Sequence, residues 1–524
     1  MHLTEHGGAS QAEELRKSKA QEFSDLMQAL LERKGKFQII LIVLLSLNSM
    51  LVGINHTITT FHTYVPKFYC RDQKNFTCDY YVNGTECPSG YQFDENDDTT
   101  LAVEYSTVCG RAMLAPLINS LYFVGVTLGS IVCSSMSDVY GRRKLVIASL
   151  YGQAIMALAQ YVSSHLMLFI VFRIMQGFFI QGLQTVSYAL IMEYSPSRFR
   201  TVAATYWESN WAVGLGILGA VAYFVRDWRM LTLVLTLPVF LTLSYVWFIP
   251  ESIVWLSTKQ RRTEATRIIH KIAKFNRNEE VVQQSNALML TEKEQPDAMS
   301  GGNDGNQKET QEKITMGVLM RNRILRKHLL SMVSVWFSVT LSYYGILYFL
   351  PNLAGSRHLN WEYGALIELL SYVMSYFIFA GFGRRMPMAL LQYCNGGLIL
   401  FMAILSALPP ESYSQWWIVA TALTAKGLAV SSFCGMFIFG SELLPTACRG
   451  LGLGLCGCAA RTGSLLAPQL MALIGVFPTF LPLGIMSVLL VLAATITLFL
   501  PETLSTILPN TIEEADQTWG SPRN

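Results

Sequence analysis

Residues 193–200 read EYSPSRFR and residues 442–449 read ELLPTACR, so the pattern Glu-x-x-Pro-x-x-x-Arg recurs after 249 residues. The triplet Gly-Arg-Arg at 141–143 returns at 383–385 in the same way, after 242 residues. Each copy follows an apolar stretch. Because short motifs return at nearly one offset, the sequence predicts two equivalent halves, each built from the same series of apolar segments.

The segments between these motifs are too apolar for a soluble enzyme. Of the 524 residues, 52% are hydrophobic and 14% are charged, whereas an average soluble domain has about 25% charged residues. An apolar helix needs about 20 residues to cross a bilayer. We therefore expect an all-α membrane protein with twelve transmembrane helices in two pseudo-symmetric six-helix bundles. The expected spans are 37–61, 112–136, 145–163, 166–192, 201–225, 228–249, 328–350, 361–381, 387–408, 415–441, 451–475 and 478–500.

Polar segments divide the chain around these spans. The first bundle ends with Pro-Glu-Ser at 250–252, and the second ends with Pro-Glu-Thr at 501–503. Residues 289–313, rich in Glu, Gln, Gly, Asn and Lys, are typical of a disordered insert. The expected parts are an N-terminal segment 1–36, a first bundle 37–249 with a loop 62–111, a linking segment 250–327, a second bundle 328–500 and a tail 501–524.

The basic residues predict the side of the membrane on which each loop lies. With the N-terminus inside, 29 of the 39 Lys and Arg residues fall on the inner side, 7 fall in outer loops and 3 lie within spans. Cytoplasmic loops carry an excess of Lys and Arg, so we expect both termini in the cytoplasm and a multi-pass protein of the plasma membrane. The net charge of +3 is too balanced for a nucleic-acid partner, because phosphate backbones bind concentrated positive surface.

The loop at 62–111 has the composition of an extracellular lobe. It contains two glycosylation sequons, which begin at Asn75 and Asn83, and four of the ten cysteines: Cys70, Cys78, Cys87 and Cys109. An even number of cysteines beside glycosylation acceptors is typical of an oxidising compartment. We expect glycosylation at both asparagines and one or two disulfides, in any of three pairings. The alternative is an unmodified loop with free thiols.

Two parallel six-helix halves, with a site between them near the bilayer midplane, describe an alternating-access carrier. The turns at inner helix ends carry charged residues that could pair across the two halves and separate when an inner gate opens. This expected gate network contains Asp138, Arg142, Glu193, Arg200, Arg384, Glu442 and Arg449. The alternative is that these residues only anchor helix ends in the headgroup region.

The turn after the second span resembles a known signature. Residues 137–144, SDVYGRRK, are similar to the D-R-x-G-R-R turn of the major facilitator superfamily. More narrowly, the chain from about 37 to 503 resembles the organic cation, anion and zwitterion transporter family, in its cysteine-bearing loop, its Pro-Glu-Ser segment and its ELLPTACR segment. Two departures predict a thinner gate network: Val139 replaces the usual Arg of the first turn, and Ala380-Gly381 replaces the usual Asp-Arg of the second.

Five ionisable residues fall inside the predicted spans: Arg173, Glu208, Glu368, Lys426 and Arg461. A charge at a helix centre costs about 2.5 to 3.5 kcal/mol on insertion scales, so such residues usually face a bundle interior, a partner or a substrate. The resemblance implies a structural role for Arg173, because an Arg in this part of the fourth span is a general feature of the superfamily. The role of Glu208 stays open.

The resemblance also implies which residues meet the substrate. The position of Arg461 is commonly acidic in the family's cation carriers and Arg in its anion and carnitine-type carriers. Lys426 and Tyr344 resemble the anion branch, while Glu368 matches an acidic position of cation and zwitterion carriers. We expect these four residues to bind substrate, with Arg461 and Glu368 at opposite ends of a zwitterion. The alternative is that Glu368 pairs with Arg461 or Lys426 and is structural.

These features predict a secondary transporter, not an enzyme. It moves small organic ions, with a preference for zwitterionic or anionic substrates, and works as a monomer in the lipid bilayer. The sequence contains no Walker loop and no HExxH or CxxC pattern, so we expect no cofactor and no metal. Two alternatives stay open: an organic cation transporter of the same family, and a transport-inactive receptor or scaffold, which the two altered turns would fit.

Overall fold

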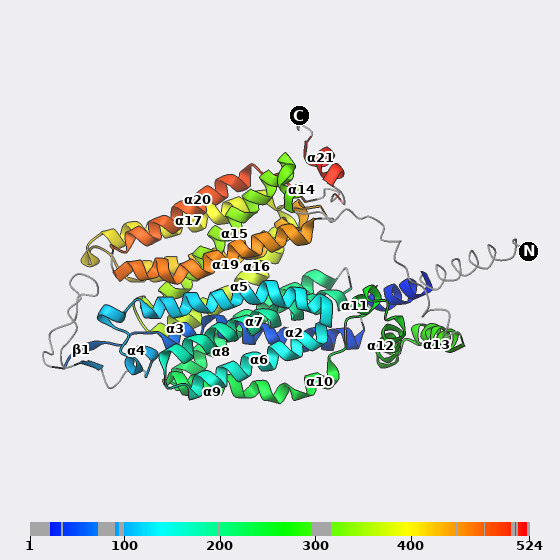
Figure 1. The fold of residues 1–524 in the computed structure, drawn as a ribbon. Coiled ribbons are helices and arrows are strands. Elements are labelled where there is room, and N and C mark those ends of the chain that lie inside the picture. Colours follow the sequence, from blue (N-terminus) through cyan, green and yellow to red (C-terminus); the bar gives the residue numbers. More distant parts are fainter. Residues whose placement is uncertain are drawn as a thin grey trace, which may run out of the picture.

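The computed structural model describes residues 21–32, 35–71, 90–93, 99–196, 199–294, 316–445, 448–475, 477–504, 509 and 512–520. The long helices in this part of the chain form two bundles that lie side by side, one from each half of the sequence (Figure 1). One end of the molecule, here called the lobe end, carries β1 (Phe68–Cys70) and α4 (Leu101–Glu104) (Figure 1). The opposite end, here called the terminal end, carries α12 (Arg262–Phe275), α13 (Glu279–Glu294) and α21 (Ile512–Gly520).

The first bundle contains six long segments in the described residues. The sixth predicted span, 228–249, is not one continuous α-helix but breaks into three pieces. Pro238 lies just after the first piece, and proline removes a backbone donor and clashes with the preceding turn, which ends an α-helix. The segments are α2 (Lys36–Thr57, extended by α3, Thr59–His62), α5 (Leu114–Tyr140), α6 (Arg142–Val162), α7 (Leu166–Tyr194), α8 (Arg200–Phe224), and α9 (Trp228–Thr236) with η3 (Leu237–Ser244) and α10 (Tyr245–Phe248).

The second bundle repeats this plan. Its helices are α15 (Arg323–Phe349), α16 (Arg357–Gly381), α17 (Arg385–Ala407), α18 (Trp416–Leu443), α19 (Arg449–Ala472) and α20 (Phe480–Leu498). Helix α15 begins five residues before the predicted span, because the Asn322 side chain accepts hydrogen bonds from the backbone N–H groups of Ile324 and Leu325, which caps the helix. By length and composition, ten segments of the described chain are apolar enough to cross a membrane. Helices α8 and α19 are outside that set.

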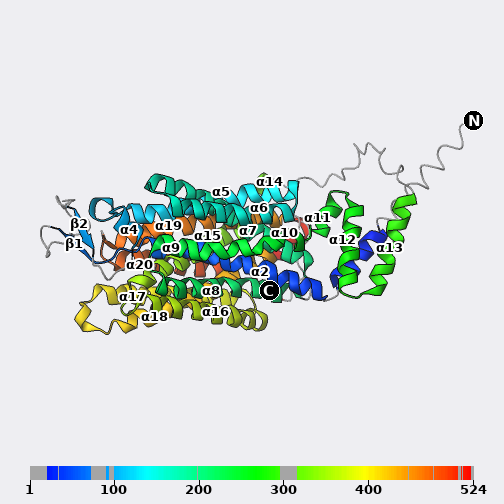
Figure 2. The ribbon, with the colours of Figure 1, turned by 90° about the horizontal axis from the view of Figure 1, so that it is seen from below.

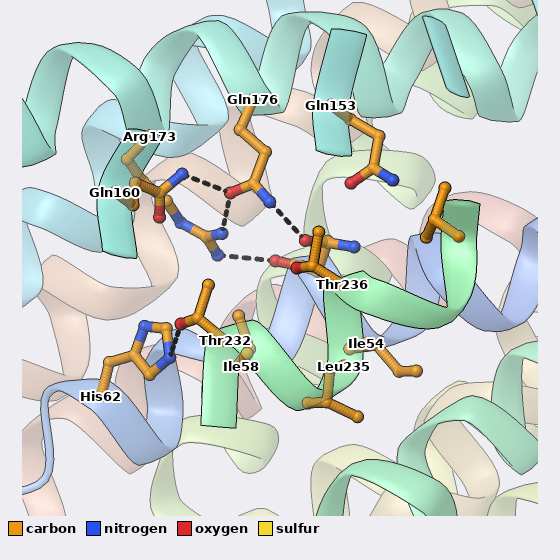
Figure 3. Close-up of a pocket in the computed structure, with 12 residues that line it drawn as sticks. Ile54, Ile58, His62, Gln153, Gln160, Arg173, Gln176, Thr232, Leu235 and Thr236 are labelled. Carbon is orange, nitrogen blue, oxygen red and sulfur yellow. Dashed lines mark hydrogen bonds between the residues drawn. The ribbon is translucent and has the colours of Figure 1, made fainter. Parts of the chain in front are cut away.

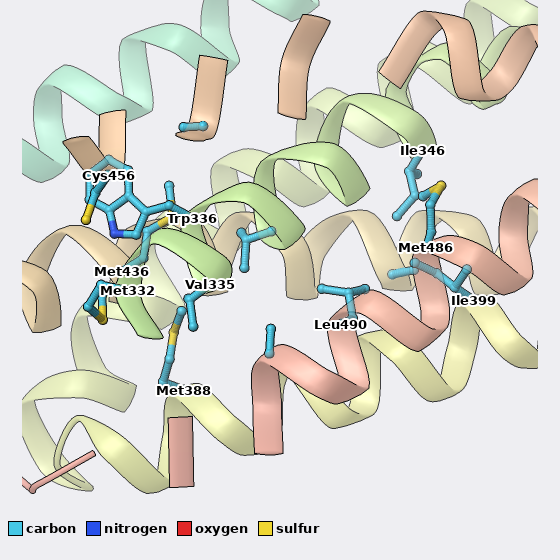
Figure 4. Close-up of a cluster of buried hydrophobic side chains, with 14 of the residues drawn as sticks. Met332, Val335, Trp336, Ile346, Met388, Ile399, Met436, Cys456, Met486 and Leu490 are labelled. Atoms are coloured by element: carbon cyan, nitrogen blue, oxygen red, sulfur yellow. The ribbon is translucent and has the colours of Figure 1, made fainter. Parts of the chain in front are cut away.

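Buried side chains hold each bundle together as a unit. In the second bundle, the cluster drawn in Figure 4 joins Met332 and Trp336 of α15 to Met388 of α17, Met436 of α18 and Met486 of α20. Methionine suits these positions, because its unbranched side chain fills irregular gaps between helices. In the first bundle, the pairs that pack most closely are α5 with α7, α6 with α7 and α2 with α8.

The two bundles meet through two helix pairs. Helix α5 packs against α19, and helix α8 packs against α16. In chain order these are the second span with the eleventh and the fifth span with the eighth. The pseudo-symmetry of the two halves matches the second span to the eighth and the fifth span to the eleventh, so it exchanges one helix pair with the other. The contact between the bundles therefore has the same pseudo-symmetry as the sequence motifs.

The linking segment folds beyond the terminal end of the bundles. It contains α11 (Ile253–Thr258), α12, α13 and α14 (Met316–Arg321), and α12 packs against α13 (Figure 2). Residues 289–294, expected to begin a disordered insert, instead complete α13. The remainder of that insert, 295–313, lies outside the described residues.

The described part of the lobe is small. Strand β1 pairs antiparallel with β2 (Tyr91–Phe93), with Phe68 opposite Phe93. Cys70 and Cys109 are both disulfide-bonded. Cys78, Cys87 and the two sequon asparagines, Asn75 and Asn83, lie outside the described residues, so their expected modification stays a prediction.

Candidate functional site

A cavity of about 670 Å³ lies between the two bundles. The first bundle contributes Gln184 of α7 and Glu208 and Trp211 of α8, and the second bundle contributes residues of α15, α16, α18 and α19. Aromatic side chains form most of the second wall, among them Trp336, Tyr343, Tyr344, Tyr372 and Phe433.

On the lobe side of this cavity the bundles are bonded to each other. Ser120 Oγ of α5 donates a 2.7 Å hydrogen bond to the Leu465 carbonyl of α19, and Gln469 Nε2 donates to Ser120 Oγ at 3.2 Å. Trp361 Nε1 of α16 donates to the Leu215 carbonyl of α8 at 2.9 Å. All these residues lie in the lobe-end portions of their helices. A substrate in the cavity could therefore reach the lobe side only after these contacts separate.

Glu208 and Arg461 are the charged residues among those that line the cavity. They are carried by α8 and α19, the two long helices that fall outside the set apolar enough to cross a membrane. Within the described part of the chain, neither residue has an opposite charge within ion-pair distance.

The two charges face different surroundings. The electrostatic neighbours of Glu208 are Glu368 and Tyr372, whereas those of Arg461 are Tyr344 and Tyr122. Helix α8 packs on α2 and α16, while α19 packs on α15 and α5. The acidic and the basic group therefore occupy separate sides of one cavity.

Several neutral polar groups of the cavity also lack partners. Gln184 Oε1, Trp336 Nε1 and Thr340 Oγ1 are buried and accept or donate no hydrogen bond among the described residues. A buried polar group without a partner costs free energy. A polar ligand or water molecules in the cavity would recover part of that cost.

The structure places two of the four expected substrate residues, Arg461 and Tyr344, in the cavity wall. Arg461 lies near the middle of α19, two residues before Gly463. A Cβ atom at Gly463 would lie 2.7 Å from the backbone oxygen of Phe337. Only glycine allows α19 to approach α15 so closely at this point, and this approach brings Arg461 beside Tyr344.

The other two expected residues, Glu368 and Lys426, do not line the cavity. They form a buried ion pair between α16 and α18, with Lys426 Nζ 3.1 Å from Glu368 Oε2. Tyr343 and Tyr372 donate hydroxyl hydrogen bonds to Glu368 Oε1, at 2.9 and 3.3 Å. The expectation that Glu368 and Arg461 hold opposite ends of a substrate is therefore corrected: Glu368 is already matched by Lys426, as in the structural alternative.

Arg173 lies in a second, smaller cavity of about 320 Å³ inside the first bundle (Figure 3). Its guanidinium donates to Gln176 Oε1 at 2.5 Å and to the Asn55 carbonyl at 2.6 Å, and its carbon Cζ lies 4.1 Å from the centre of the Tyr122 ring. Gln176 Nε2 donates in turn to Asn55 Oδ1. These contacts tie α2 to α7, in agreement with a structural role for Arg173.

The expected gate residues cluster at the terminal end, but their ion pairs stay within one bundle. Arg142 pairs with Glu193 at 3.3 Å and with Asp138 at 2.9 Å. Arg384 pairs with Glu442 at 3.1 Å in the equivalent position of the second bundle. The predicted pairing across the two halves is wrong for these residues, because each Arg starts the helix next to the one that carries its partner.

Two acidic residues that were not assigned to this network are central to it. Glu251 Oε1 accepts hydrogen bonds from the backbone N–H groups of Arg142 and Arg143, at 2.8 and 3.1 Å. Glu502 accepts from the N–H groups of Arg384 and Arg385, at 2.8 and 3.0 Å. The recurrence of Pro-Glu-Ser as Pro-Glu-Thr was the sequence signal that could have identified both.

The two remaining arginines of the predicted network each begin a helix: Arg200 begins α8 and Arg449 begins α19. Arg200 is exposed. Arg449 Nε donates a 3.4 Å hydrogen bond to the Leu444 carbonyl of the same bundle. Thr503 Oγ1 donates to Glu442 Oε2 at 2.6 Å, so the acidic partner of Arg384 is also tied to the chain that leaves the last span.

Comparison with known proteins places this site in context. The family described as sugar (and other) transporter matches residues 68–519. The organic cation transporter protein of Drosophila melanogaster is 33% identical over 443 residues, covering 84% of this chain and 78% of that protein. The human organic cation/carnitine transporter 2 is 32% identical over 432 residues, covering 82% and 74%. Solute carrier family 22 member 6-A of Xenopus laevis is 31% identical over 443 residues, covering 83% and 76%.

The fold itself is similar to solved structures. The inward-open xylose transporter XylE from E. coli matches with a TM-score of 0.64 and 16% identity, over 92% of this chain and 100% of that one. A partially occluded inward-open structure of XylE matches with a TM-score of 0.63 and 14% identity, over 90% and 100%. At this level of identity the likeness concerns the fold alone, and it confirms the predicted arrangement of two six-helix bundles.

Proposed function

Because this chain belongs to the organic cation, anion and zwitterion transporter family of the major facilitator superfamily, we propose that it carries small organic ions bearing a carboxylate, either anions or zwitterions. The family consists of transporters, not enzymes. The substrate binds in the cavity between the bundles. The relatives named above include transporters of organic cations and of carnitine, so the family alone does not select a substrate charge.

One observation carries the preference for a carboxylate. Arg461 lines the cavity, and no carboxylate of the described chain lies within ion-pair distance of it. A guanidinium is always charged and presents a planar fork that matches a carboxylate. An organic cation placed beside Arg461 would meet a like charge in a low-dielectric site, whereas a carboxylate would offset the cost of the buried Arg.

The contacts on the lobe side support a rocking mechanism. The bonds between Ser120 and Leu465 and between Trp361 and Leu215 join the two bundles, while the Arg142 and Arg384 clusters lie within single bundles. If the hydrogen bonds between Ser120 and Leu465 and between Trp361 and Leu215 broke, the lobe side would open. Each bundle would stay rigid, because its own ion pairs would remain intact. This is the movement that alternating access requires of two repeats around a fixed site.

We further propose that the lobe end faces the outside of the plasma membrane and that both termini lie in the cytoplasm. The excess of basic residues in the loops of the terminal end supports this orientation. Accessibility of an epitope tag at either terminus, with and without permeabilisation of intact cells, tests it. Tags that are detected without permeabilisation would contradict it.

The proposed function is tested by uptake into proteoliposomes that contain the purified protein and no ATP. We expect saturable uptake of labelled organic carboxylates, with or without an added ammonium group, and much slower uptake of labelled organic cations that have no carboxylate. Saturable binding of these carboxylates without any uptake would instead favour the receptor alternative. Faster uptake of cations than of carboxylates would contradict the proposed preference.

A further inference from the structure

We propose that Glu208 binds the positively charged end of the substrate, so that the preferred substrates are zwitterions whose ammonium and carboxylate groups are separated by a spacer. This inference rests on the proposed function and narrows it, because Arg461 alone would accept any anion. It also gives a role to an acidic residue that the family resemblance left without one.

The first support is that Glu208, the acidic residue of the cavity wall, has no cation within ion-pair distance among the described residues. Glu368 lies close by, but its charge is matched by Lys426 at 3.1 Å. The Tyr372 hydroxyl interacts with both carboxyl groups: it donates a 3.3 Å hydrogen bond to Glu368 Oε1 and is also a hydrogen-bonding neighbour of Glu208, but it carries no positive charge. Glu208 thus lines the cavity with a polar neighbour but with no cation of the described chain beside it. A substrate ammonium would supply the missing charge.

The second support is the aromatic surface next to this carboxylate. Trp211 follows Glu208 by three residues, about one helical turn, and both line the cavity. Tyr343, Tyr372 and Phe433 line the same cavity from the second bundle. Aromatic ring faces attract organic cations, most strongly where the cation is desolvated. A carboxylate combined with several ring faces is the chemistry that recognises a primary or quaternary ammonium.

The third support is the separation of the two charges. Glu208 and Arg461 do not pair with each other, and their electrostatic neighbours differ. They are also carried by opposite bundles. A zwitterion with a spacer could touch both, and it would then draw the two bundles together around itself. An α-amino acid has only one carbon atom between its charged groups, so we expect it to be a poorer substrate than a zwitterion with a longer spacer.

Three probes of nearly equal shape test this inference: 4-(trimethylammonio)butanoate, its methyl ester and 5,5-dimethylhexanoate. The first is a zwitterion, the ester keeps only the positive charge, and the third keeps only the negative charge because carbon replaces nitrogen. For the wild-type protein in proteoliposomes, we expect initial uptake of the zwitterion to exceed that of either relative by about tenfold or more, as expected for the loss of one charged contact.

The variant Glu208→Gln keeps the shape of the side chain and removes its charge. We expect it to lower uptake of the zwitterion by about tenfold and to leave uptake of 5,5-dimethylhexanoate within about twofold of wild type, while Glu208→Asp retains part of the preference. The control is Glu411→Gln, which removes an exposed carboxylate outside the cavity and should leave the ratio of the two uptake rates unchanged.

Several outcomes would overturn the inference. Equal uptake of the zwitterion and the anion by the wild type would show that Glu208 does not select an ammonium group. An equal loss for all probes in Glu208→Gln would assign Glu208 to ion coupling or to folding. If the Glu208→Gln variant does not reach the membrane, the relative uptake of the three probes by the wild-type protein tests the inference instead. Carboxylate uptake without zwitterion preference would leave the proposed function intact, whereas failure of all carboxylates would contradict both.

Discussion

The Glu368 carboxylate lies 3.1 Å from Lys426 Nζ, and both side chains are buried. Removal of one partner from such a pair leaves an uncompensated buried charge, which costs about 3 to 5 kcal/mol. We therefore expect Glu368→Gln to lower the melting temperature of the purified protein markedly and Glu368→Gln with Lys426→Met to recover most of it. The control is Glu264→Gln, which breaks the exposed pair with Arg261 and should change stability by about 1 kcal/mol or less. A double variant no more stable than the single one would contradict this role.

The glycines of the two equivalent turns should be intolerant of substitution. Gly141 has φ of +101° and Gly383 has φ of +92°, a region that disfavours residues with a Cβ atom. A Cβ at Gly141 would lie 2.3 Å from Glu251 Oε2. We expect Gly141→Ala and Gly383→Ala each to destabilise the protein by about 1 to 3 kcal/mol. Gly381→Ala is the control, because its Cβ would meet nothing within 4 Å. Equal melting temperatures for all three variants would show that the two turns do not require glycine.

Glu502 should contribute a pH-dependent part of the stability. Burial raises its pKa, but hydrogen bonds from the backbone N–H groups of Leu504, Arg384, Arg385 and Thr503 outweigh burial and hold the pKa below the usual 4.5. A carboxyl whose pKa is lowered on folding stabilises the protein above its unfolded pKa and loses that contribution as the pH falls.

The variant Glu502→Gln tests this contribution. At pH 7 we expect it to be less stable by about 1 to 3 kcal/mol. Between about pH 5 and pH 3, as the pH falls through the lowered folded-state pKa of Glu502, the melting temperature of the variant should fall less than that of the wild type, since the variant has no such group to protonate. Parallel curves over this range would show that the Glu502 hydrogen bonds do not depend on its charge.

The lobe-side contact between α5 and α19 should open during each transport cycle. Gln469 Nε2 lies 3.2 Å from Ser120 Oγ, so cysteines at both positions are close enough for a short bis-methanethiosulfonate cross-linker. We expect cross-linking of the Ser120→Cys/Gln469→Cys variant to reduce uptake about tenfold or more, and reduction to restore it. Each single variant, treated in the same way, is the control. Full uptake by the cross-linked protein would exclude separation at this point.

Much of the fold could be predicted from the sequence because it depends on local patterns. The spans follow from apolar length, and the two halves follow from motifs that recur at nearly one offset. The turn clusters illustrate where this reasoning ends. The pairing of Arg142 with Glu193 within one bundle depends on which helix ends lie side by side, and helix packing cannot be read from the turn motifs.

The site was predictable only in part for a related reason. A charged residue in a span indicates that its side chain avoids lipid, but it does not indicate which internal face the side chain meets. Arg461 and Glu368 gave the same sequence signal, yet one lines the cavity and the other is enclosed with Lys426. The sequence left the role of Glu208 open, and its place on the wall of the same cavity as Arg461 emerges only when the two bundles are assembled.

The most direct test of the whole account is the ratio of Vmax to KM for uptake of 5,5-dimethylhexanoate and 4-(trimethylammonio)butanoate by Arg461→Gln in proteoliposomes. Loss of a charged contact with the carboxylate is worth about 1.5 to 3 kcal/mol, so we predict a fall of about ten- to a hundredfold for both probes. Arg267→Gln, which changes an exposed residue of α12, should match the wild type. If Arg461→Gln reaches the membrane and keeps the wild-type ratio for both probes, the cavity between the bundles is not the carboxylate site.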